Sequence, residues 1–202
     1  LHLSSAAVQG HRPVLDESTD VEPFSAYSRS KALGEAALGT RKAGACPVTC
    51  LRATSVQGAA RQTTASLVRI ASTPLASVAG RGDSPSAVSS VDALCAFVLA
   101  AGRYPGEVPA VILQPWEGAT VASVLLAAGG RKPLRLPGWL CRAGLKAGYA
   151  VSRLLGERLH GTLRRVEMMW FGQRQEPGWA EATGNVPEPR VEQVLRAARQ
   201  QR

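Results

Sequence analysis

The stretch from residue 25 to residue 56 reads SAYSRSKALGEAALGTRKAGACPVTCLRATSV. Its first part, from Ser25 to about Gly44, is rich in Ala and Leu, which are strong helix formers, and Gly44 predicts the helix end. Its second part, Pro47–Val56, is mostly apolar and β-rich, as in a strand that is buried in a parallel sheet. A helix followed by a buried strand is the repeating unit of α/β folds.

The same alternation extends on both sides of this stretch. Leu1–Ser5 resembles the end of a strand, and residues 9–24 are predicted as a loop because Gly, Pro and Asp recur there. Further predicted strands are residues 75–79, 87–91, 108–113 and 132–136. Further predicted helices are residues 62–72, 93–101 (N-cap Asp92, apolar almost all round and buried), 120–128 (N-cap Thr120, ended by Gly129 and Gly130), 139–159, 162–172 and 188–199. The pattern predicts an α/β fold with a parallel sheet.

Composition and charge exclude several classes of protein. The chain has 202 residues, of which 45% are hydrophobic, enough for one sizeable core. Because it contains no uncharged apolar run of about 18 residues, we expect no membrane-spanning helix. Its 24 Lys and Arg exceed its 15 Asp and Glu, but the excess lies in residues 131–175. So local an excess argues against a nucleic-acid-binding protein.

The basic stretch predicts an amphipathic helix. Arg142, Lys146 and Arg153 fall on one helix face, and the apolar residues fall largely on another: Leu140, Ala147, Val151, Leu154 and Leu155. One interpretation is attraction of a nucleotide-sugar diphosphate or of anionic lipid headgroups. The interpretation that we favour is a helix whose apolar face packs on the protein body and whose cationic face is solvated. A weak contact with a membrane surface stays open.

The cysteines give no sign of a metal site or a disulfide framework. Cys46, Cys50, Cys95 and Cys141 form no C-x-x-C pair, and no His lies near them at zinc-ligand spacing. We therefore expect reduced, partly buried thiols, no bound metal and a cytoplasmic location.

Three residues suggest proton-transfer chemistry. Tyr27 and Lys31 are four residues apart on the predicted helix, and so lie on one face a turn apart. Ser5 ends the preceding strand, and ligands of doubly wound sheets bind beyond the carboxyl ends of the strands. A tyrosine phenol has a pKa of about 10, so its use as a base near pH 7 requires about 4 kcal/mol. An ammonium roughly 4 Å away supplies about that amount.

Four ordered motifs extend this trio into a family resemblance. They are residues 4–10 (SSAAVQG), 23–35 (PFSAYSRSKALGE), 51–58 (LRATSVQG) and 88–94 (VSSVDAL). In this order they resemble the extended short-chain dehydrogenase/reductase superfamily, in particular the NAD-dependent epimerase/dehydratase family that modifies nucleotide sugars. The resemblance covers most of the chain and is sharpest over residues 3–58.

The resemblance implies roles for individual residues. Ser5, Tyr27 and Lys31 match the catalytic Ser/Thr, Tyr and Lys. Tyr27 and Lys31, with Ala53, Thr54 and Val56, would bind NAD or NADP, whereas Ser5, Ala6 and Ser55 would bind substrate. Glu35 is expected to face solvent, and Asp16 and Glu17, in the loop at 9–24, are expected to be solvated or to contact a substrate hydroxyl. Residues 1–60 would be the carboxyl-terminal part of a Rossmann-like domain, and residues 61–202 mainly a smaller α/β substrate domain with basic carboxyl-terminal helices.

The implied activity is oxidoreductase chemistry on a nucleotide sugar, as an epimerase or 4-keto reductase. Ala6 and Ala7 stand where a dehydratase of the family carries acidic residues, which disfavours dehydration. The sequence contains no Gly-rich dinucleotide turn, so we expect a fragment that begins at about the fifth strand. Alternatives are a catalytically silent relative, a binding module, or a reductase of steroid- or flavonoid-like alcohols. The family habit also implies a homodimer that uses the helix at 25–44.

Overall fold

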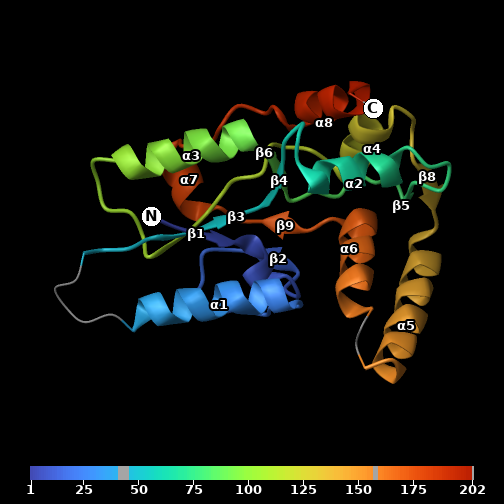
Figure 1. The fold of residues 1–202 in the computed structure, drawn as a ribbon, viewed down its shortest axis with the longest axis horizontal. Helices are drawn as coiled ribbons and strands as arrows, with labels where there is room; N and C mark the ends of the chain where they lie inside the picture. Colours follow the sequence, from blue (N-terminus) through green and yellow to red (C-terminus); the bar gives the residue numbers. More distant parts are fainter. Residues whose placement is uncertain (41–45, 157–158, 202) are drawn as a thin grey trace. The chain divides into compact units, whose positions relative to one another are not determined.

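A computed structural model describes residues 1–40, 46–156 and 159–201. Within this part of the chain, helices and strands follow one another as the sequence predicts for an α/β fold (Figure 1). The residues form two compact units, each made of segments that are distant in the sequence. Unit 1 contains residues 1–56, 88–117 and 175–189, and unit 2 contains residues 57–87, 118–174 and 190–202. The division expected near residue 60 lies beside the first of these boundaries, but two later segments also belong to unit 1.

Unit 1 contains the parallel sheet. β1 (His2–Ser5), β3 (Cys50–Ala53) and β7 (Val111–Leu113) pair in that order, and both pairings are parallel. All residues of β3 are buried, as expected of a central strand. The other elements of unit 1 are η1 (Ala6–Gln9), β2 (Val14–Leu15), α1 (Ala26–Gly39), β4 (Ser55–Gln57, which ends at the unit boundary), β6 (Val88–Ser90), α3 (Val91–Arg103) and α7 (Gly178–Thr183).

The hydrophobic core of unit 1 lies between this sheet and two helices. Leu51 of β3 and Ile112 of β7 pack with Phe97 of α3 and Trp179 of α7. The Phe97 and Trp179 rings meet edge to face, with centroids 5.8 Å apart. α7 is a short helix that the sequence pattern did not predict, yet it supplies the largest aromatic side chain of this core.

α3 differs from its prediction in two ways. Its N-cap is Ser90, whose Oγ accepts a hydrogen bond from the Ala93 N–H at 3.1 Å, and Asp92 lies within the first turn. The helix is also not buried all round, because Ala93 and Phe97 face the core whereas Leu99 is 54% exposed. An apolar composition on every side had hidden which face packs.

α1 begins where the sequence predicts. The Oγ of its N-cap, Ser25, accepts the Ser28 N–H at 3.1 Å, and the Ser28 Oγ accepts the Ser25 N–H at 2.9 Å. The helix ends at Gly39, and the predicted end at Gly44 lies outside the described residues. Within α1, Ser28 is the buried residue. Apolar burial therefore contributes little to holding α1 on its unit.

Unit 2 is built mainly of helices. Its elements are α2 (Gln62–Ala71), β5 (Ser77–Ala79), α4 (Val121–Gly129), β8 (Leu134–Leu136), α5 (Gly138–Leu154), α6 (His160–Phe171), β9 (Arg174–Gln175, which ends at the unit boundary) and α8 (Val191–Gln200). α2, α4 and α8 pack together, and β5 pairs in parallel with β8. The predicted N-cap Thr120 is confirmed, and Gly130 ends α4 at φ +74°, a conformation that favours glycine. A Cβ on Gly129 would lie 2.1 Å from the Ala71 carbonyl oxygen, so this glycine permits the close approach of α2 and α4.

α5 and α6 pack against each other at one end of unit 2 (Figure 1). Cys141, Leu145 and Ser152 are the buried residues of α5. The expectation that the apolar face of this helix packs on the body is wrong, because its larger members are exposed: Leu140, Val151, Leu154 and Leu155. Among the described residues, no helix combines the length and apolar character needed to cross a membrane.

Candidate active site

Ser5 lies at the carboxyl edge of the parallel sheet. It pairs with Ala53, and Arg52 pairs with Leu113, so β1, β3 and β7 end at the same edge. The Ser5 Oγ accepts the Ala7 N–H at 3.2 Å and thereby caps η1. Because the oxygen is the acceptor in this bond, the hydroxyl hydrogen can be donated to a ligand. Ligands of doubly wound sheets bind at this edge, and Ser5 offers a hydroxyl donor there.

Lys31 extends from α1 to the strand that ends at Ser5. Its Nζ donates to the carbonyl oxygen of Leu3 at 3.0 Å, two residues before Ser5. An ammonium has three donors, so this bond anchors the cation and leaves it able to donate to a ligand as well. Tyr27 lies one turn earlier on α1 and is 57% exposed. The Ser5 hydroxyl thus ends β1 and the Lys31 ammonium is bonded to it, whereas the convergence of the Tyr27 hydroxyl with them stays a prediction.

The other predicted ligand-binding residues lie near the same edge in different environments. Ala53 belongs to the hydrophobic core, and Val56 packs against it. Ala6 and Thr54 are buried, whereas Ser55 is exposed. A ligand at this edge would therefore meet the backbone rather than the side chains of the buried residues. Their roles in binding cofactor or substrate stay predictions.

A buried ion pair, which the sequence did not predict, holds α1 in place. Glu35 was expected to face solvent, and this expectation is wrong. Its Oε2 lies 2.7 Å from Nη2 of Arg52, and the Ser4 hydroxyl donates to its other oxygen. The Arg52 side chain is 0% exposed and that of Glu35 is 9% exposed. An arginine inside an otherwise apolar strand was the signal for this pair, since a buried charge needs a partner.

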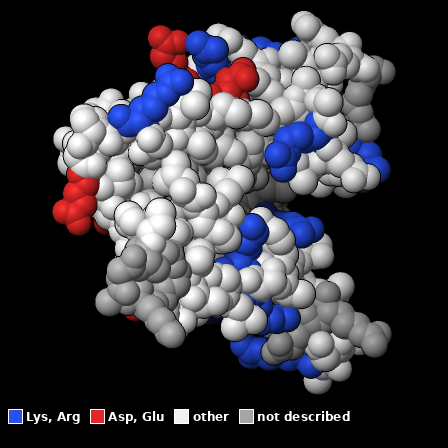
Figure 2. All heavy atoms as spheres, turned by 60° about the vertical axis from the view of Figure 1, so that its left-hand side comes forward, with Lys and Arg blue, Asp and Glu red and all other residues white. Residues whose placement is uncertain are grey.

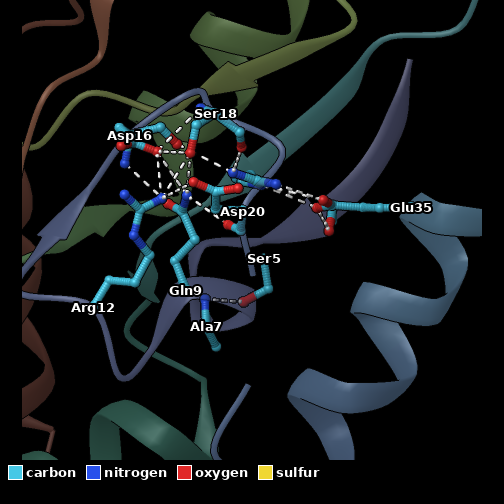
Figure 3. Close-up of polar contacts among 10 residues, drawn as sticks. Ser5, Ala7, Gln9, Arg12, Asp16, Ser18, Asp20 and Glu35 are labelled. Carbon is cyan, nitrogen blue, oxygen red and sulfur yellow. Dashed lines mark hydrogen bonds and ion pairs between the residues drawn. The ribbon is translucent and has the colours of Figure 1, made fainter. Parts of the chain in front are cut away.

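Arg52 also fixes the loop that follows η1. Its Nη1 donates to the carbonyl oxygens of Asp16 and Ser18, at 3.2 and 2.7 Å. Figure 3 shows Glu35 reaching from α1 toward this loop region, where the Asp16, Ser18 and Gln9 side chains gather. One guanidinium therefore connects β3, α1 and the loop at 16–18, which all surround the strand that ends at Ser5.

The Asp16 carboxylate further stabilises this loop. Asp16 accepts hydrogen bonds from Gln9 at 2.7 Å and Ser18 at 2.6 Å, and forms an ion pair with Arg12 at 3.2 Å (Figure 3). Burial alone would raise the pKa of Asp16, but these hydrogen bonds and the Arg12 charge together lower it. A substrate contact or a solvated loop was expected here, whereas the structure shows a carboxylate engaged within the loop.

Glu17 joins the same loop to two distant parts of unit 1. Its Oε1 accepts the backbone N–H of Leu113 at 3.0 Å, and its Oε2 accepts that of Trp179 at 2.9 Å. Glu17, like Asp16, was expected to be a solvated side chain or to contact substrate. Instead it connects the end of β7 with the start of α7, so its role in the structure is architectural.

A polar network lies just beyond the end of β3. The hydroxyl oxygens of Thr54 and Ser89 are 2.7 Å apart, and the Gln114 Nε2 donates to Ser89 at 2.8 Å. The Gln114 Oε1 in turn accepts the Thr54 N–H at 3.2 Å. All three residues are buried. The network fixes the backbone that leaves β3 relative to β6 and to the end of β7, and no periodic pattern in the sequence indicates it.

The side chains that commonly bind metals do not form a cluster of metal ligands within the described residues. Cys50 and Cys141 are buried, whereas Cys46 and Cys95 are exposed. Burial, reinforced by the nearby Glu35 carboxylate, raises the pKa of the Cys50 thiol.

Comparisons with known proteins give a family match over part of the chain and a similar fold over nearly all of it. Residues 1–92 match the NAD dependent epimerase/dehydratase family. No curated protein is similar enough in sequence to count as a relative. Among solved structures, UDP-glucuronic acid 4-epimerase from Bacillus cereus in complex with NAD has a TM-score of 0.62 at 18% identity, over 97% of this chain and 58% of that one.

Two further structures show the same likeness. Human epimerase family protein SDR39U1 (isoform 2) with NADPH has a TM-score of 0.59 at 19% identity, over 98% of this chain and 64% of that one. A functionally unknown conserved protein from Silicibacter pomeroyi has a TM-score of 0.56 at 16% identity, over 98% and 64%. The chain thus spans less than two thirds of the length of each. It has a Rossmann-like α/β fold, and its residues 1–92 match the NAD dependent epimerase/dehydratase family.

Proposed function

We propose that this chain carries the catalytic serine, tyrosine and lysine of an NAD(P)-dependent epimerase or 4-keto reductase that acts on a nucleotide sugar. The observation that carries the proposal is the bond from Lys31 to the Leu3 carbonyl, which holds the ammonium on the strand that ends at Ser5. The family match supports the choice of cofactor, as do two of the solved neighbours, which are complexes with NAD and with NADPH.

The donor set at the sheet edge fits the nicotinamide end of such a cofactor. Lys31 offers a cation with donors for ribose hydroxyls, and the backbone at 53–56 offers polar groups beside it. The cofactor, when bound, would accept or supply a hydride. In the proposal, Tyr27 exchanges a proton with the reacting oxygen of the substrate, and the positive charge of Lys31 favours that exchange. Ser5 donates a hydrogen bond to the same substrate oxygen and keeps it in place.

The test compares two tyrosines of unit 1. Tyr27→Phe removes the hydroxyl proposed to transfer the proton, whereas Tyr104→Phe keeps the ring that meets Trp179 edge to face at 5.3 Å. Turnover is measured with UDP-glucuronic acid and NAD, and with a nucleotide 4-keto sugar and NADPH. We expect Tyr27→Phe to lose about a hundredfold or more in rate and the control to keep its rate.

Equal rates for wild type and Tyr27→Phe would refute the proposed chemistry. Calorimetry with NAD and NADPH separates the alternative of a silent relative, which predicts cofactor binding without turnover in the wild type. Lys31→Met adds a second readout: it should weaken cofactor binding as well as the rate, whereas Tyr27→Phe should affect mainly the rate.

A further inference from the structure

The outward side of α5 presents a continuous apolar surface. Trp139 is 71% exposed and Leu154 is 87% exposed. Between them Ala143 and Ala150 continue one stripe at spacings of four and seven residues, and all are exposed. A neighbouring stripe contains Leu140, Ala147 and Val151, which are exposed as well. Side chains of this size ordinarily pack inside a protein, so a contiguous exposed set marks a contact surface.

The opposite side of α5 is firmly held by α6. The Tyr149 hydroxyl donates to Glu167 at 2.9 Å, and Ser152 is hydrogen-bonded to His160 at 2.8 Å. Burial, followed by the hydrogen bond and charge of Glu167, raises the pKa of Tyr149 to about 12. The helix is therefore oriented by its inner face, and its exposed stripes are a fixed feature of unit 2.

Positive charge flanks the apolar stripes. Lys146 and Arg153 are exposed beside the stripe that contains Trp139, and residues 131–156 contain no Asp or Glu. The other cations of that range are Arg131, Lys132, Arg135 and Arg142. On the face of the molecule drawn in Figure 2, Lys and Arg side chains outnumber Asp and Glu. An apolar helix face with a one-signed cationic border is complementary to an anionic, partly apolar surface.

This charge pattern selects among the occupants that could cover the face. In a two-fold dimer the same patch meets itself, which would bring Lys146 and Arg153 of two copies together without a carboxylate. An anionic bilayer instead offers phosphates for the cations and acyl chains for Trp139 and Leu154. We propose that α5 lies in the interface of a membrane that contains anionic lipid, with its Trp139–Leu154 stripe inserted at the headgroup level.

The experiment measures co-sedimentation of the full chain with vesicles. One set contains phosphatidylcholine alone, and the other contains equal parts phosphatidylcholine and phosphatidylglycerol. We expect binding to the anionic vesicles that weakens with added salt, and little binding to phosphatidylcholine alone. The double variant Trp139→Ser/Leu154→Ser should weaken binding by roughly tenfold or more, since both side chains would leave the acyl region.

Matched controls distinguish binding through the exposed face of α5 from nonspecific binding to vesicles. Leu75→Ser replaces a leucine of unit 2 that is 80% exposed but lies outside α5, and it should bind like wild type. Lys146→Gln/Arg153→Gln should weaken binding about fivefold for each cation, whereas Arg29→Gln/Arg69→Gln, which removes two exposed cations elsewhere, should have a much smaller effect. Because all these side chains are exposed, circular dichroism should show the same fold in every variant.

Three results would overturn the proposal. The first is no binding to anionic vesicles at low salt. The second is binding that the α5 variants leave unchanged or that the control pairs weaken equally. The third is a dimer in sedimentation velocity that Trp139→Ser/Leu154→Ser dissociates, since a second copy would then cover this face. None of them bears on the activity proposed for Tyr27, which is measured without lipid.

Discussion

Replacing Glu35 by alanine should destabilise the protein far more than its position on α1 suggests. The carboxylate receives Arg52 Nη2 at 2.7 Å and Nε at 3.2 Å, as well as the Ser4 hydroxyl. Without it the Arg52 guanidinium, 0% exposed, would keep its hydrogen bonds to the backbone carbonyl oxygens of Asp16 and Ser18 but lose its anionic partner. An uncompensated buried charge of this kind costs about 3–5 kcal/mol. That is a large part of the ~5–15 kcal/mol by which a typical domain is stable.

The assay is urea unfolding at neutral pH, followed by circular dichroism and by fluorescence. Glu107→Ala, which truncates an exposed glutamate of the same unit, is the matched control and should cost less than about 0.5 kcal/mol. The double variant Glu35→Leu/Arg52→Met removes both charges together. It should be less destabilised than the sum of the two single variants, because neither charge is left alone in the interior.

The residual cost of the double variant has a specific source. Arg52 Nη1 donates to the carbonyl oxygens of Asp16 and Ser18, which would lose a donor and cost about 1–3 kcal/mol. The idea of a buried, energetically coupled pair is refuted if the unfolding free energies of Glu35→Ala and Glu107→Ala differ by less than about 1 kcal/mol. It is also refuted if the effects of the single variants at Glu35 and Arg52 add up to that of the double variant.

Three other outcomes follow from the ionisable groups. The pKa of Asp16 is lowered below 3.8 in the folded protein, so the charged carboxylate stabilises the fold above pH 3.8. This contribution is lost as the pH falls through the pKa of the folded state. Asp16→Asn should therefore lower the unfolding free energy at neutral pH and differ less from wild type in acid. The pKa of Tyr149 is raised to about 12, so its contribution is present below pH 10.0 and lost as the pH rises toward 12; ultraviolet titration should show a late phenol that Tyr149→Phe removes. Burial raises the pKa of the Cys50 thiol, so a thiol reagent followed by mass spectrometry should label the exposed Cys95 before Cys50.

The order of helices and strands could be predicted because it depends on local patterns. The capping serine at 25 and the Ala-rich run after it define α1, and the apolar run at 50–53 defines the buried strand β3. Thr120 and Gly130 bound α4 for equally local reasons, a hydroxyl that satisfies free N–H groups and a left-handed φ. The short elements β2 and α7 escaped prediction because contacts with distant residues stabilise them. The Glu176 N–H donates to the Leu15 carbonyl oxygen of β2 at 2.9 Å, and the Glu17 carboxylate accepts the Trp179 N–H of α7.

In the candidate site, too, the features that depend on local patterns could be predicted and those that depend on distant contacts could not. The position of Ser5 at the end of β1 and that of Lys31 on α1 follow from local patterns, and the bond from Lys31 to Leu3 brings the ammonium to that strand. The Glu35–Arg52 pair joins residues 17 positions apart that no periodic pattern links, so the sequence did not indicate that Glu35 is buried. The exposed face of α5 was missed for the opposite reason: an apolar stripe predicts burial against something, and the sequence does not say against what.

The contacts of Lys31 and Glu35 explain how α1 is held on its unit. A helix that buries little besides Ser28 cannot be held mainly by the hydrophobic effect. Polar contacts with the strands hold it instead: the Lys31 ammonium on the Leu3 carbonyl, and the Glu35 carboxylate on Arg52 and Ser4. Polar contacts of this kind are directional, whereas apolar packing tolerates sliding. Because Glu35 follows Lys31 by one turn, its pairing with the interior of β3 sets the rotation of α1 and so the side of the helix on which Tyr27 and Lys31 stand.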